Sequence, residues 1–187
     1  MISGHMTVDE FQSWRDLPEN QDRKCELHLG KIVDVPLAGE LYGIVSAIVG
    51  YRLMSYSLLH GRGTVFGKSA GLVTSDDTVL GPNLMMIGER VGRKDLSKGF
   101  CRRVPLLCVE LLSSCNDLTI MMRRVIQYLK LGVFLIWVID SDDQAVIEFS
   151  LSGQMRVLDE SDTLTGNGIL PDFSCPVADL FRLPGTA

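Results

Sequence analysis

The sequence predicts a single α/β domain built on a mixed β-sheet with helices packed against it. The chain has 187 residues and is 46% hydrophobic, which is enough to bury one sizeable core. Segments of strand and helix character alternate along it, and no internal repeat, linker or low-complexity tract interrupts them. From Val104 to Asp140 the pattern is apolar strand, helix, apolar strand, with one glutamate, Glu110, inside the first apolar run.

The first third of the chain predicts a helix, a hairpin and a long helix. "TVDEFQSW" begins with Thr7 as N-cap and has Glu10 three residues later, which is a capping box. "KCELHLGKIVDVP" predicts two short strands around a turn at Leu29-Gly30. "GELYGIVSAIVGYRLMSYSLLHG" predicts a long helix that Gly61 can end. Its apolar residues at helical spacing are Leu41, Ile44, Val45, Ile48 and Leu53.

Strands and one further long helix are predicted for the rest of the chain. "TVFGKSAGLVTS" and "LMMIG" are strand candidates, separated by the turn-forming "SDDTVLGPN". The helix "DLTIMMRRVIQYLKLG" has Asn116 as N-cap and Gly132 at its end. "AVIEFS" and "QMRVLD" indicate a hairpin, and "PVADLF" a short helix. Trp137 is assigned to the core, and core packing alone is assigned to an apolar stripe of Leu118, Met121, Met122, Val125, Tyr128 and Leu129.

Charge and hydropathy narrow the class of protein. The formal net charge of −5 argues against a general nucleic-acid coat protein, although it allows a local basic patch. The apolar run from Val133 to Ile139 is far too short to span a bilayer, so no membrane association is expected. No signal peptide is visible, and the opening "MISGHM" is typical of a cloning remnant. We therefore expect residues 1–6 to be an added extension and residues 7–184 to form the domain.

Cysteines and histidines give no sign of a disulfide framework or a metal site. The five cysteines are odd in number and form no CxxC pair, as in a cytoplasmic protein whose thiols stay reduced. His5 belongs to the suspected extension, and His28 and His60 lie far apart without ligand spacing. This pattern argues against a histidine-based metal site.

The order of the elements resembles the PD-(D/E)XK nuclease superfamily, and more narrowly the bacterial Uma2 family of restriction-endonuclease-like proteins. The resemblance covers almost the whole chain and depends on the order and spacing of several stretches. It implies the restriction-endonuclease-like fold, with a central mixed β-sheet flanked by helices. The stretches are "CELHLGKIV", "GRGTVFG", "TVLGPNLMMI", "VPLLCVELLSS", "RVIQYLKLGVFLIWVID" and "DTLTGNGILPDFSCPVADLF".

The resemblance implies an endonuclease that cleaves DNA phosphodiesters with Mg²⁺ or Mn²⁺. Such a hard cation needs oxygen ligands, and it would activate water while a nearby lysine assists. The family's "PD" aspartate falls on Asn83 and its strand glutamate on Glu110, so these two would be the metal ligands. The family's helix lysine falls on Arg124, as a phosphate-stabilising cation, and an auxiliary hairpin glutamate falls on Glu26. Tyr42 stands about where the family often has a histidine.

Two of the three core positions depart from the family pattern. An amide at Asn83 removes a negative charge, which weakens the binding of a hard cation. Arg124 stays cationic and can clamp a phosphate, but arginine is effectively never deprotonated and cannot accept a proton. The segment Ser113 to Asn116 also differs from the family's "SPSD". We therefore expect metal binding and cleavage to be weak or absent.

Plain structural roles stay open for the same residues. Glu110 could be a buried glutamate paired with Arg124, because a carboxylate in an apolar strand is costly without a partner. Asn83 could be a turn residue after a proline, and Glu26 could lie on the hairpin surface. Arg124 could lie on a solvated helix face, with Arg123 taking the assigned position.

A second hypothesis assigns the chain a non-catalytic role, binding nucleic acid or another protein. The loop "ERVGRKDLSKGFCRR" precedes the Glu110 strand and is rich in basic residues. It is either a solvated loop or a surface that contacts DNA phosphates. The resemblance also implies a homodimer. The candidate nucleic-acid-binding residues are Arg93, Lys94, Lys98, Arg102 and Arg103.

Overall fold

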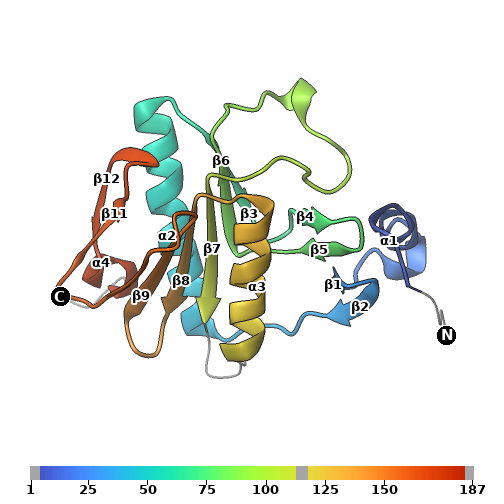
Figure 1. Cartoon of the computed structure of the whole chain (residues 1–187), viewed down its shortest axis with the longest axis horizontal. Coiled ribbons are helices and arrows are strands. Elements are labelled where there is room, and N and C mark those ends of the chain that lie inside the picture. The colour runs from blue at the N-terminus through green and yellow to red at the C-terminus, as the bar shows by residue number, and fades with distance from the viewer. Residues whose placement is uncertain (1–4, 113–117, 184–187) are drawn as a thin grey trace.

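A six-stranded sheet forms the centre of the fold (Figure 1). The computed structural model of the protein describes residues 5–112 and 118–183. The helices are α1 (Val8–Arg15), α2 (Glu40–His60), α3 (Leu118–Leu131) and α4 (Ala178–Phe181), with 3-10 helices η1 (Pro18–Asn20) and η2 (Arg93–Asp95). The strands are β1 (Cys25–His28), β2 (Lys31–Asp34), β3 (Thr64–Gly67), β4 (Leu72–Ser75), β5 (Thr78–Leu80), β6 (Leu84–Ile87), β7 (Leu107–Leu112), β8 (Leu135–Asp140), β9 (Ala145–Ser150), β10 (Met155–Leu158), β11 (Thr163–Gly166) and β12 (Leu170–Pro176).

The central sheet has the strand order β10-β9-β8-β7-β6-β3. β7 and β8 are parallel and joined by α3, and every other neighbouring pair is antiparallel. β3 and β7 both run antiparallel to β6, so they point the same way. The C-terminal ends of β3, β7 and β8 therefore meet the start of β6 at one edge of the sheet. The mixed sheet flanked by helices that the sequence predicts is confirmed.

The two long helices cover opposite faces of this sheet. Alternate residues of a strand point to opposite faces, and β7 follows this rule. Val109 packs with the buried residues of α2, such as Val49. Cys108 packs with the buried residues of α3, such as Val125. Glu110 has the same strand parity as Cys108, which turns its side chain toward α3.

Two smaller sheets complete the structure. The sheet β2-β1-β5-β4 lies beside α1, whose Phe11 packs with Leu27 and Val79 in a separate core cluster. The hairpin β11-β12 packs with α4 against the α2 side of the main core. Within the described residues, no helix is both long and apolar enough to cross a membrane.

Turn and capping signals in the sequence predicted the local structure well. Thr7 and Glu10 form the reciprocal hydrogen bonds of a capping box. Leu29 and Gly30 both have positive φ angles, 48° and 74°, between β1 and β2. Gly61 ends α2 in a left-handed conformation, φ 62°, where a residue without a Cβ is favoured. The Asn116 cap of α3 lies outside the described residues.

Four local features differ from what the sequence predicts. "TVFGKSAGLVTS" forms two strands in different sheets, β3 and β4, and the stretch taken as a turn contains β5. The β11-β12 hairpin was not predicted, because its alternation of buried and exposed residues is short and rich in turn residues. α2 buries Val45, Val49, Leu53 and Tyr56 and leaves Leu41 and Ile44 exposed, so its inward face is rotated from the predicted one.

Candidate active site

The guanidinium of Arg124 lies between the carboxylates of Glu26 and Glu110. Its Nε donates to Oε1 of Glu110 at 2.8 Å, and its Nη1 donates to Oε2 of Glu26 at 2.6 Å. Its Nη2 also donates to the carbonyl oxygen of Gly81 at 3.2 Å. Glu26 is 7% exposed and Glu110 is 3% exposed, so both carboxylates are removed from bulk water. One arginine thus joins β1, β7 and α3.

Tyr128 is a fourth member of this cluster, one helical turn beyond Arg124 on α3. Its fully buried hydroxyl donates a short hydrogen bond to Oε1 of Glu110. Burial, together with the Glu110 carboxylate, raises the pKa of Tyr128 well above its ordinary value, despite the opposing charge of Arg124. Tyr128 therefore keeps its proton and stays a donor. The prediction that Tyr128 only packs in the core was wrong. Helical spacing predicts which face of α3 is buried, but it does not predict the hydrogen-bond partner of a hydroxyl on that face.

Glu26 accepts hydrogen bonds at both carboxylate oxygens. Oε1 accepts from the Gly81 backbone N–H at 2.6 Å, and Oε2 lies 2.6 Å from Nε2 of His28. Burial raises the pKa of Glu26, but the His28 hydrogen bond and the Arg124 charge together outweigh it and lower the pKa to about 2. Glu26 is therefore ionised at neutral pH, and the surface position that the sequence left open is wrong.

The pKa of Glu110 is shifted in the opposite direction from that of Glu26. Its complete burial raises its pKa above the ordinary value, although Arg124 and Tyr128 both favour its ionised form. Burial penalises the charged carboxylate more than two donors on one oxygen can offset. The two glutamates that share Arg124 thus have pKa values displaced to opposite sides.

Asn83 is fully engaged by its neighbours at the start of β6. Its Oδ1 accepts from the backbone N–H of Leu111 at 3.1 Å, and its Nδ2 donates to the hydroxyl of Tyr42. Lys68, just after β3, donates to the same hydroxyl at 3.2 Å. The amide is 2% exposed, and it links β6, β7 and α2.

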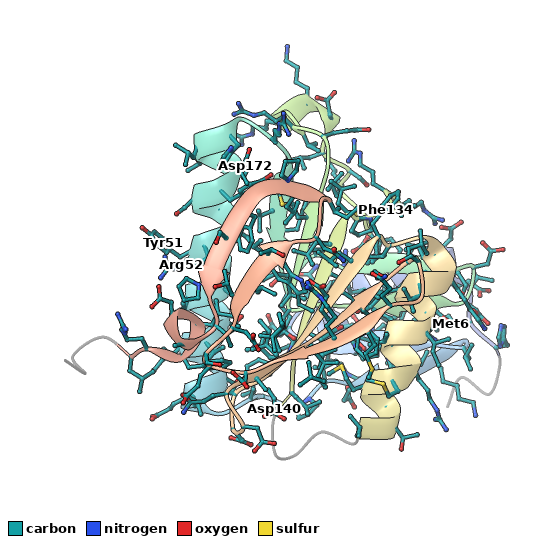
Figure 2. All side chains as sticks on the ribbon, turned by 60° about the vertical axis from the view of Figure 1, so that its left-hand side comes forward. Met6, Tyr51, Arg52, Phe134, Asp140 and Asp172 are labelled. Carbon is teal, nitrogen blue, oxygen red and sulfur yellow. The ribbon has the colours of Figure 1, made fainter. Side chains whose placement is uncertain are left out.

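Glu26, His28, Asn83, Glu110 and Arg124 line a cleft of about 620 Å³ at the sheet edge where β3, β7 and β8 end and β6 begins. Its floor is polar, and its walls come from the β2-α2 connection and the start of α3. Ser141, which follows β8, lines it too. It directly follows Asp140, the last residue of β8, which Figure 2 labels. The polar lining residues are Glu26, His28, Asp34, Glu40, Tyr42, Lys68, Asn83, Glu110, Arg124, Ser141 and Asp142, and the apolar ones include Val33, Val35, Leu37, Leu41, Leu112, Ile120 and Met121.

Comparison with known proteins identifies the family. The sequence model of the family described as "Uma2: Putative restriction endonuclease" matches residues 8–178. The chain belongs to the Uma2 family. A crystal structure of "a putative nuclease belonging to DUF820" from Anabaena variabilis superposes with a TM-score of 0.80 at 20% identity, covering 94% of this chain and 97% of that one. At this identity the likeness shows the fold alone, and that fold is the restriction-endonuclease-like one. No curated protein matches the sequence.

The residues assigned from the Uma2 resemblance come together in one cleft. Glu26, Asn83, Glu110 and Arg124 all line it, although they come from β1, the β5-β6 connection, β7 and α3. Arg123, the competing candidate, is exposed and lies outside it. Sequence reasoning missed Lys68, Ser141 and the hydrogen-bonding roles of Tyr128 and His28. No spacing signal relates Lys68 or Ser141 to Glu110, because only the strand order brings them to the same edge.

The basic loop of this Uma2 protein lies at the other end of β7. In Figure 1 the segment between β6 and β7 forms the loop at the top of the view, whereas the C-terminal end of β7 points to the bottom. None of Arg93, Lys94, Lys98, Arg102 and Arg103 lines the cleft. Arg102 pairs with Asp9 at 2.7 Å, and Arg103 donates to the Asp95 carbonyl.

The donor set does not fit a divalent cation. Mg²⁺ needs several oxygen ligands in near-octahedral geometry. Here the amide oxygen of Asn83 is used by a backbone N–H, and the guanidinium of Arg124 already occupies the space between Glu26 and Glu110. In residues 5–112 and 118–183, no group of three or more His, Cys, Asp or Glu side chains could hold a metal ion.

Proposed function

We propose that this Uma2 protein keeps the nuclease fold and its active-site cleft but cleaves DNA phosphodiesters weakly or not at all. The observation that supports this proposal is the double hydrogen bonding of Arg124 to Glu26 and Glu110. A Mg²⁺ or Mn²⁺ ion would have to displace a buried guanidinium from two carboxylates. Removing one partner of such a buried pair costs about 3–5 kcal/mol, which disfavours the exchange.

Asn83 and Arg124 also leave the cleft without a general base of the family type. The amide of Asn83 is neutral and does not titrate, and both of its polar ends are already bonded. Arg124 cannot take a proton from water at any physiological pH. The arrangement is suited to holding β1, β7 and α3 in place, and it offers little to a developing phosphorane.

The test is cleavage of supercoiled plasmid and single-stranded DNA with Mg²⁺ or Mn²⁺. Wild type should cleave DNA no faster than Glu110→Ala. Its affinity for Mn²⁺, measured by loss of the free-ion EPR signal, should be no higher than that of Glu110→Ala. Metal-dependent cleavage by wild type that Glu110→Ala abolishes would overturn the proposal. Asn83→Asp combined with Arg124→Lys restores the family residues, and this double variant should gain Mn²⁺ affinity.

A second role, metal-independent nucleic-acid binding, is supported by the basic loop. Arg93, Lys94 and Lys98 are exposed, and within the described part of the chain none of them pairs with an acidic side chain. Unpaired cations on one surface loop can contact successive phosphates without a metal. The loop lies at the opposite end of β7 from the cleft, so DNA bound to the loop would not contact the former catalytic centre.

We also propose that the protein forms a homodimer through α2. The outer face of this helix presents an uncharged stripe, and Figure 2 shows Tyr51 on the side of α2 turned away from the sheet. Surface helices usually turn charged residues outward. All residues of the stripe are exposed, and a contiguous exposed apolar patch often marks an interface. The stripe consists of Ile44, Ala47, Tyr51, Met54 and Leu58.

A second copy is the occupant that suits the α2 stripe. The stripe contains no charge, so two copies related by a two-fold axis bury no like charges against each other. Arg52, the nearby cation, is already paired with Asp179 at 3.1 Å. A membrane surface would instead be expected to attract a stripe flanked by free basic residues.

A further inference from the structure

We propose that the cleft is a binding site for a small amphipathic monoanion, with the anionic head at Lys68 and Tyr42 and a polar far end at Ser141. The inference deepens the proposed function and rests on it, because the cleft must be free of metal chemistry. The ligand class is an acyl or alkyl chain with a single oxyanion head of one charge, a carboxylate or a sulfate monoester.

The hydroxyl of Tyr42 is arranged as a donor to the cleft. Its oxygen accepts from Nδ2 of Asn83 and from Nζ of Lys68. The amide of Asn83 cannot be reversed, because its Oδ1 is used by the Leu111 N–H. With two donors on the phenol oxygen, the phenol hydrogen is left for a third group, and the cleft is the open side.

Lys68 supplies the charge for the anionic head. Its Nζ lies 5.1 Å from the centre of the Tyr42 ring and donates to the Tyr42 hydroxyl, which uses one of three N–H groups. No acidic side chain of the described residues pairs with it. The deeper cation, Arg124, is saturated by Glu26 and Glu110, so Lys68 is the cation that a ligand can reach.

Ser141 marks the opposite end of the cleft. It is 6% exposed, it lines the cleft, and its Oγ has no hydrogen-bond partner among the described residues. An unpaired buried hydroxyl is costly, and a ligand acceptor or donor would satisfy it. Lys68 follows β3 and Ser141 follows β8, three strand spacings away along one edge, or about 14 Å.

The walls between these two ends are apolar and the rim is acidic. Val33, Leu37 and Ile120 line the cleft and are all at least 40% exposed, so a hydrocarbon body would remove them from water. Glu40 and Asp142 stand exposed at the rim, whereas Asp34 is paired with Arg23. Two unpaired rim carboxylates repel a polyanionic nucleic-acid backbone more than a ligand with one charge.

Calorimetric titration in EDTA tests the site with ligands of matched tails. Decanoate and decyl sulfate distinguish the two head groups, while decanol and decyltrimethylammonium are the neutral and cationic controls. Wild type should bind one or both anions at least tenfold more tightly than either control. Lys68→Met should weaken anion binding at least tenfold and leave decanol unchanged. Lys130→Met, an exposed lysine outside the cleft, should change nothing.

The role of Ser141 is tested with a ligand that carries a hydroxyl at the end opposite its anionic head. 10-Hydroxydecanoate should bind more tightly than decanoate, and Ser141→Ala should remove that difference. Absence of saturable anion binding, equal affinity in Lys68→Met, or stronger binding of the cation would each overturn the inference. If the anions do not bind and wild type does not cleave plasmid, the inferred ligand site is wrong and the proposed loss of activity still stands. Plasmid cleavage by wild type would overturn that proposal by its own assay.

Discussion

Nε of Arg124 donates to Oε1 of Glu110 at 2.8 Å, so a cation on helix α3 is paired with the buried carboxylate of strand β7. The same guanidinium reaches Glu26 on a different sheet. Arg124 therefore cross-links α3 to two sheets. Its properties should be those of a buried ion-pair network, and stability measurements can examine them directly.

Arg124→Met should destabilise the protein by about 3–5 kcal/mol, because it leaves two carboxylates buried without their shared partner. Urea denaturation at pH 7 measures this change. Arg123→Met is the matched control, since Arg123 is the exposed neighbour on the same helix and should change stability by less than about 0.5 kcal/mol. Equal effects of the two substitutions would show that the network contributes nothing. Adding Glu110→Gln to Arg124→Met should recover part of the loss.

The Glu26 carboxylate should make stability fall in acid. Its folded pKa of about 2 lies below the ordinary value of 4.5, so its contribution is present above pH 4.5 and is lost as pH falls toward 2. The difference is on the order of 3 kcal/mol. Urea denaturation from pH 2 to pH 6 should show a steeper acid loss in wild type than in Glu26→Gln. Parallel curves for the two proteins would contradict the assignment.

Glu110 should act at higher pH and in the opposite sense. Its folded pKa is raised, so its contribution is present below pH 4.5 and is lost as pH rises through the folded value. Glu110→Gln keeps the shape and removes the charge, and it should make stability less dependent on pH between 4.5 and neutrality. A steeper dependence in this variant would mean that the pKa of Glu110 is lowered.

Much of the fold was predictable from local signals, whereas the site depended on topology. The capping box at Thr7 and the turn at Leu29-Gly30 involve residues close in sequence, so their chemistry is visible in the letters. Glu110 could be recognised as unusual because a carboxylate in an apolar strand needs a partner. The contact between Arg124 and Glu26 spans 98 residues, and that between Lys68 and Tyr42 crosses from β3 to α2. Only the motif order of a known family, or the sheet itself, brings such residues together.

The basic loop should bind DNA without metal and with a steep salt dependence. Three phosphate contacts predict a slope of about −3 in a plot of log affinity against log salt. Arg93→Glu, Lys94→Glu and Lys98→Glu together should lower affinity at least tenfold in fluorescence anisotropy with EDTA. The triple variant Lys24→Glu, Lys31→Glu and Lys130→Glu has the same net charge and changes exposed lysines elsewhere. Equal losses in both variants would mean that only net charge matters.

The α2 stripe should hold two copies together in solution. Tyr51 is 68% exposed and Leu58 is 69% exposed, so Tyr51→Glu combined with Leu58→Glu leaves the folded core untouched and places two like charges against two in the dimer. Analytical ultracentrifugation should find a dimer for wild type and a monomer for this variant. Met155→Glu is the control, because Met155 is 63% exposed on the edge strand β10, where strand pairing is the competing route to association. Dissociation of the dimer by Met155→Glu would contradict an interface at α2. So would a wild type that is monomeric at every concentration of a roughly 100-fold dilution series.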